Sequence, residues 1–64
     1  MEEIDIWRTA HVLMTQHGHE AGMFAAKRAQ ELRVQGDLDG CAAWISIWRS
    51  IDALRVRNRA RARR

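Results

Sequence analysis

The stretch that decides the fold is RAQELRVQGDLDGCAAWISIWRSI, residues 28–51. One apolar helical pattern ends in it, Gly36-Asp37 follows, and a second apolar helical pattern begins. Glycine adopts the left-handed conformation that commonly ends a helix. Aspartate accepts hydrogen bonds from the first N–H groups of the next helix, and both Asp37 and Asp39 are candidates for that role. The stretch therefore predicts a helical hairpin with a short turn.

The helix after the turn carries an unusually wide apolar stripe. At 100° per residue the stripe covers about half of the circumference, whereas a surface helix needs a stripe only somewhat over ~100° wide. We therefore expect this helix to contact both other helices, or one of them and another chain. Arg55 would fall at the centre of the stripe, so its packed part should end near Leu54. The stripe consists of Cys41, Trp44, Ile45, Ile47, Trp48, Ile51 and Leu54.

Two further helices are predicted upstream. A helix over residues 20–35 stops at Gly36, and its alanines at positions 21, 25 and 29 allow a neighbouring helix to approach closely. A helix over residues 3–17 begins with acidic residues, which suit the positive end of the helix dipole, and Gly18 is its expected C-cap. Its apolar stripe leaves out Ile4 and Val12, which are candidates for exposure or for a second contact.

The fold class predicted is all-α, a small three-helix bundle with a flexible basic C-terminal tail. Sixty-four residues allow one domain, which would bury only ~60% of its unfolded surface. We place the three-helix domain at residues 1–54 and the arginine-rich tail at residues 55–64. Because so small a chain needs its bulky residues inside, the expected core includes Trp7, Phe24, Leu32, Trp44, Trp48 and Ile51.

The tail, RVRNRARARR, concentrates the positive charge. Residues 1–54 hold five basic and eight acidic residues, a net charge of −3, and the tail adds +6 to give +3 for the chain. Such an arm is typical of binding to an anionic partner, and a solubilising end without a target is the alternative. The residues predicted to bind an anionic partner are Arg55, Arg57, Arg59, Arg61, Arg63 and Arg64.

Two resemblances accompany these patterns. Residues 28–51, with the Gly36-Asp37 turn, Ala42 and the aromatic residues after it, resemble the hairpin of a tetratricopeptide repeat. Such repeats bind proteins when stacked, and only one junction is present here. Residues 4–54 also resemble an uncharacterised family of small bacterial three-helix proteins. This second resemblance implies the fold but no catalytic residues, and the tail lies outside it. It is carried by Trp7, His17-Gly18, Ala25-Ala26-x-Arg28-Ala29, Leu32, Gly36-Asp37-x-x-Gly40, Trp44 and Ile47.

No pattern indicates a catalytic or cofactor site. His11, His17, His19 and Cys41 are chemically suitable zinc ligands, but their spacing matches no known motif, and we predict no metal. Cys41 lies near the start of a helix, where a thiolate is favoured, yet no histidine is close to it in sequence. Trp44 and Trp48 share a face and are predicted to be core residues, with an exposed aromatic platform as the alternative.

The function expected is that of a non-enzymatic helical module for protein–protein interaction, through self-association or another partner, with the arginine tail on an anionic surface. A small non-specific nucleic-acid-binding accessory protein is the alternative. The apolar faces favour a homodimer over a monomer. The N-terminus is acidic and no apolar run approaches the ~20 residues of a membrane span, so we expect a cytoplasmic protein. Since no pattern indicates a cofactor site, we expect no cofactors.

Overall fold

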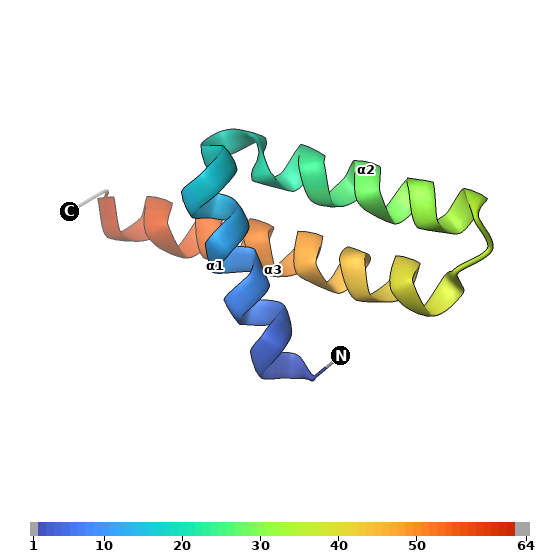
Figure 1. Ribbon diagram of the computed structural model, residues 1–64. Helices are drawn as coiled ribbons and strands as arrows, with labels where there is room; N and C mark the ends of the chain where they lie inside the picture. Colours follow the sequence, from blue (N-terminus) through green and yellow to red (C-terminus); the bar gives the residue numbers. More distant parts are fainter. Residues whose placement is uncertain (1, 63–64) are drawn as a thin grey trace.

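The protein is built of helices (Figure 1). The computed structural model describes residues 2–62, and in them the order is α1 (Glu3–His17), a 3₁₀ turn η1 (Gly18–Glu20), α2 (Ala21–Val34) and α3 (Leu38–Ala62). The all-α prediction is confirmed. Because α1, η1 and α2 follow one another without a gap, the chain forms one long helical run bent at Gly18 and a second helix, α3, after the turn.

The bend depends on the backbone of Gly18. Its φ of 59° and ψ of −130° belong to a region that glycine reaches because it has no Cβ. The Gly18 N–H donates to the Met14 carbonyl and closes the last turn of α1. Gly18 is therefore the C-cap that the sequence predicts, and η1 then leads directly into α2.

The turn between α2 and α3 is closed from both sides. Gly36, at φ 85°, donates its N–H to the Arg33 carbonyl, and the Asp37 N–H reaches the Leu32 carbonyl at 2.9 Å. These two bonds form a Schellman motif. Asp37 also accepts the Gly40 N–H on its side-chain Oδ1 at 2.9 Å, so it is Asp37 rather than Asp39 that caps α3.

The core lies where α1 and α2 meet α3. Figure 1 shows α2 and α3 side by side and antiparallel, with α1 crossing the hairpin near the bend. Contacts of α3 with both other helices confirm that its wide stripe serves two neighbours. Small residues of α1 and α2 meet larger ones of α3, which explains the alanine row of α2. The core cluster consists of Ala10, Leu13, Ala21, Ala25, Ile47, Ile51 and Leu54, with Ile6, Met14 and Trp44 packed against it.

The predicted burial is wrong for three of the six expected core residues. Leu32 and Ile51 are buried and Trp44 packs against the core, but Trp7, Phe24 and Trp48 are 38%, 41% and 47% exposed. The reason is that alanines and isoleucines fill the closest contacts, so the bulky rings lie at the margins of the helix interfaces. Ile4 and Val12 are exposed, as their positions off the stripe of α1 predict.

The C-terminal part of α3 extends beyond the packed body. Leu54 is the last buried residue among residues 2–60, yet the helix continues through Ala62, so the described part of the arginine stretch is helical. Figure 1 shows this end of α3 projecting past the crossing with α1. Within residues 2–62, no helix is both long and apolar enough to cross a membrane.

Candidate functional site

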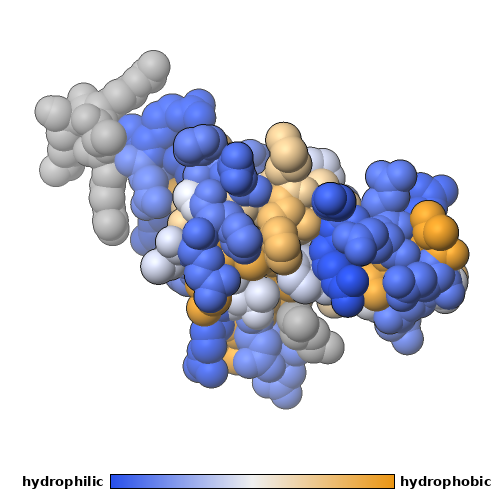
Figure 2. Space-filling view, turned by 45° about the horizontal axis from the view of Figure 1, so that its top comes forward, coloured by the Kyte–Doolittle hydropathy of each residue, from blue (hydrophilic) through white to orange (hydrophobic). Residues whose placement is uncertain are grey.

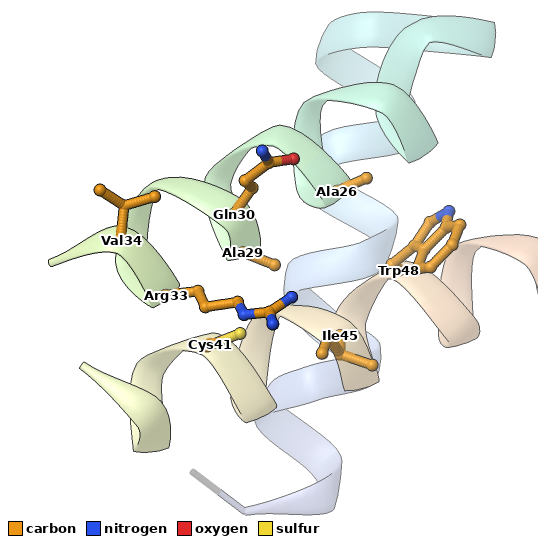
Figure 3. Close-up of a pocket in the computed structure, with 8 residues that line it drawn as sticks. All are labelled: Ala26, Ala29, Gln30, Arg33, Val34, Cys41, Ile45 and Trp48. Carbon is orange, nitrogen blue, oxygen red and sulfur yellow. The ribbon is translucent and has the colours of Figure 1, made fainter. Parts of the chain in front are cut away.

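An open groove runs between α2 and α3, and we call its lining the groove face. It has a volume of about 490 Å³. Figure 3 shows the lining side chains on both helices, with Arg33 extending between α2 and α3 and α1 passing behind the hairpin. The groove face consists of Ala26, Ala29, Gln30, Arg33 and Val34 from α2 and Cys41, Ile45 and Trp48 from α3.

Small residues on α2 create this hollow. Ala26 and Ala29 present only methyl groups to the larger Ile45 and Trp48 across the groove. One end of the Trp48 indole lies over Gly22, whose missing Cβ would be 3.6 Å from the ring. That separation is an ordinary van der Waals contact, so half of the indole packs on α2 while the other half remains open to a partner.

Apolar side chains reach the surface along the same side of the hairpin. Met23, Gln30 and Val34 lie seven and four residues apart, which places them on one side of α2. Met23 is 74% and Val34 is 81% exposed. Figure 2 shows apolar residues in orange reaching the surface among hydrophilic ones, in the middle of the view and again at one end. Val34 is part of the groove face, and Met23 adds exposed apolar surface on the same side of α2.

The structure sets Arg55 apart from the other arginines of the predicted anionic-partner set. Its guanidinium donates to the Gly18 carbonyl at 3.3 Å and also to the His19 carbonyl. It thus ties α3 to the bend, and it is half-buried there. Arg57 and Arg59 are exposed on the projecting end of α3. Arg61 belongs to α3, but its side chain, with Arg63 and Arg64, lies outside the described residues.

We expect the Arg55→Met variant to lose about 1 kcal/mol of unfolding free energy. The two carbonyls at the bend would exchange a charged donor for water, while the methionine stem would preserve much of the packing. Urea denaturation of the variant beside the parent measures the loss. Arg59→Met, an exposed change one turn further along α3, is the control and should stay within ~0.5 kcal/mol of the parent. Equal losses of unfolding free energy in the two variants would contradict a stabilising contact between Arg55 and the bend.

The histidines and Cys41 do not form a shared site. In the described chain, no group of three or more histidine, cysteine or acidic side chains is placed to hold a metal ion. His17 instead stacks on Phe24 with ring centroids 4.5 Å apart, and Phe24 meets Trp44 edge-on at 6.0 Å. These contacts fasten the end of α1 to the α2/α3 hairpin. Trp44 is therefore structural, whereas Trp48 resembles the exposed platform considered as an alternative.

Comparison with known proteins identified no relative of this chain. No family model matches the chain, and neither a curated protein nor a solved structure is significantly similar to it. The likeness to small bacterial three-helix proteins and to a tetratricopeptide hairpin therefore stays a prediction from the sequence. The groove face was not singled out in the sequence, although the Trp44/Trp48 spacing and the small residues of α2 are signals of it.

Proposed function

We propose that the protein is a non-enzymatic helical interaction module that associates with itself as a homodimer. Its first 54 residues would form the interaction domain, and its basic C-terminal end would contact an anionic surface. The observation that carries the proposal is Trp48, which is 47% exposed at an open apolar groove. A half-exposed aromatic ring in a hollow is the kind of side chain that dominates binding at protein interfaces.

The extent of apolar exposure also supports association. Nine large apolar side chains are exposed within residues 2–62. Contiguous apolar surface on a small protein commonly marks an interaction site.

The surroundings of Cys41 do not favour a catalytic thiol. A nucleophile needs a base within hydrogen-bond reach. Cys41 lies near the α2/α3 turn, while His17 and His19 lie at the bend, at the opposite end of the hairpin in Figure 1. Neither histidine at the bend is therefore placed to act as a base for Cys41.

Sedimentation equilibrium at micromolar concentration tests self-association. We expect a species of about 14.8 kDa, twice the 7.4 kDa of one chain, that dissociates on dilution. The interface available is small, so a dissociation constant in the micromolar range is expected. A single 7.4 kDa species over the whole concentration range would contradict the homodimer.

The second candidate function is non-specific nucleic-acid binding. It is favoured by Arg57 and Arg59, which are exposed on a helical end that projects from the body. At 100° per residue these two side chains lie about 200° apart, so positive charge surrounds the helix. An arm of this kind can approach phosphates from several directions without reading base sequence.

A further inference from the structure

We propose that the groove face binds the groove face of a second copy, with each α3 running antiparallel to its counterpart. The inference rests on the proposed self-association and specifies which surface forms the dimer. It is carried by the arrangement of apolar and charged side chains along α3 and by one arginine of α2.

The groove face continues along α3 beyond Trp48. Cys41, Ile45, Trp48 and Asp52 are spaced by four, three and four residues, so they lie on one side of the helix. Trp48 lines a second, adjoining hollow together with Arg49 and Asp52. One end of the face therefore carries Arg33 beside Cys41, and the other end carries Asp52, with Arg49 next to it at the outer edge.

This pattern is complementary to itself. Ile45 and Trp48 lie on either side of the midpoint between Cys41 and Asp52. A two-fold axis through that midpoint and across the helices would place Ile45 opposite the Trp48 of the second copy. The same rotation would bring the Arg33 end of one copy against the Asp52 end of the other. A two-fold interface requires one patch to match itself in this way.

The two charged side chains are available for such a contact. Arg33 and Asp52 are both exposed. Among the side chains of residues 2–60, the only ion pair is between Arg28 and Glu31, at 3.8 Å. Figure 3 shows the Arg33 side chain extending from α2 across the groove toward α3. Trp48 contacts α2. At about 100° per residue, Asp52 lies about 40° and Arg49 about 100° around α3 from Trp48, so Arg49 lies further from α2 than Asp52.

The area of the face suits a weak dimer. The 14 residues of α2 correspond to a length of about 21 Å, and two packed helices are about 20 Å wide. The flat projection is then about 400 Å², and protruding side chains such as Trp48 and Val34 raise the accessible area. A standard interface buries about 800 Å² on each partner. The groove face lies below that size, which agrees with micromolar association.

The start of α1 of a second copy is the other surface that could occupy the groove, but it matches the groove less well. The start of α1 is acidic and exposes Ile4 and Trp7, so its chemistry also suits the groove. However, α1 packs on the far side of the hairpin from the groove (Figure 3). Binding of α1 by the groove would join copies front to back, and such contacts tend to form open chains. The groove-to-groove contact instead closes after two copies.

Charge reversal tests the arrangement. Arg33→Asp and Asp52→Arg would each set like charges against each other in both symmetric contacts, and each should weaken dimerisation at least tenfold in sedimentation equilibrium. The double variant Arg33→Asp/Asp52→Arg exchanges the charges and should restore the dissociation constant to within about threefold of the parent. Arg8→Asp, an exposed reversal on α1, is the matched control and should leave it unchanged. Far-UV circular dichroism confirms that every variant is folded.

The possible results separate the two proposals. A dimer that neither reversal weakens would overturn the groove-to-groove contact and leave self-association standing on another face. Single reversals that weaken the dimer without rescue in the double variant would overturn the pairing of Arg33 with Asp52. A parent chain that is monomeric throughout would overturn both proposals and leave the groove face to a different protein.

Discussion

Replacing Ile51 with alanine is expected to lower the unfolding free energy by about 2–5 kcal/mol. Ile51 is fully buried in the cluster that joins α3 to both other helices. Its loss would leave a cavity that the surrounding alanines cannot fill. Because a domain of this size rarely has more than ~5 kcal/mol of stability, most of the variant should be unfolded at room temperature. Urea denaturation followed by far-UV circular dichroism measures the change.

Trp48→Ala is the informative comparison. Although tryptophan is the larger residue, Trp48 is half exposed and contacts α2 with one side only. We therefore expect a loss well below that of Ile51→Ala, about 1–2 kcal/mol. Both proteins should be measured at a concentration where the parent is monomeric, because dimerisation adds to apparent stability. A Trp48→Ala protein as unstable as Ile51→Ala would contradict the exposure of the indole.

Local signals in the sequence predicted the bend after α1 and the turn between α2 and α3, although not the continuation of α3 through Ala62. Gly18, Gly36 and Asp37 act through their own backbone and the N–H and carbonyl groups next to them, so their roles follow from residue type and position. The alanine row of α2 likewise has one consequence, close approach of a neighbour, wherever that neighbour lies. These features need no knowledge of the tertiary arrangement.

The position of the tryptophans could not be predicted in the same way. Helical spacing shows that Ile45, Ile47, Trp48 and Ile51 belong to one wide stripe, but it does not show which half of the stripe is covered. That depends on where α1 crosses α3. In the structure the crossing covers Ile47 and Ile51 and leaves Ile45 and Trp48 at the groove. The predicted burial of Trp48 was wrong because residue size indicates a need for contact without indicating its location.

Arg55 shows a similar limit. In the sequence it is the first residue of an arginine-rich tail and falls at the centre of the apolar stripe, which predicts the end of packing but not a hydrogen-bond partner for its guanidinium. Its hydrogen-bond acceptors, the Gly18 and His19 carbonyls, lie more than 30 residues away along the chain. The Gly18 carbonyl also accepts the Ala21 N–H within the 3₁₀ turn, so Arg55 adds a side-chain donor to a bend that the backbone already closes. Only the tertiary fold brings α3 to that bend.

This division of roles allows the two candidate functions to be separated. The groove face lies on the α2/α3 hairpin, and the exposed arginines lie on the projecting end of α3. Arg55 belongs to the folded body by its contacts. A truncation after Leu54 would therefore remove a stabilising contact as well as positive charge. A truncation after Val56 removes five arginines and keeps the tie to the bend.

We expect the protein ending at Val56 to lose most of its affinity for nucleic acid at low salt. Each phosphate contact contributes about 0.7–0.9 to the slope of log affinity against log salt concentration. If all five removed arginines contact phosphates, the slope should fall by about 4. The affinity at low salt should then fall by about a hundredfold or more. Arginine's fixed set of donors suits phosphate oxygens, so the loss should be similar for duplexes of different sequence.

Fluorescence anisotropy with a labelled duplex and a labelled single strand, at low and at physiological salt, measures the loss. Arg55→Met is the matched control, because it removes one positive charge at the body while leaving the projecting arginines in place, and it should change the slope by no more than about 1. Equal binding by the parent and the protein ending at Val56 would show that the projecting arginines do not contact phosphate, and the nucleic-acid function would then be wrong. Sedimentation equilibrium of the protein ending at Val56 also tests the dimer. A groove-to-groove dimer should persist in it, because no residue of the groove face has been removed.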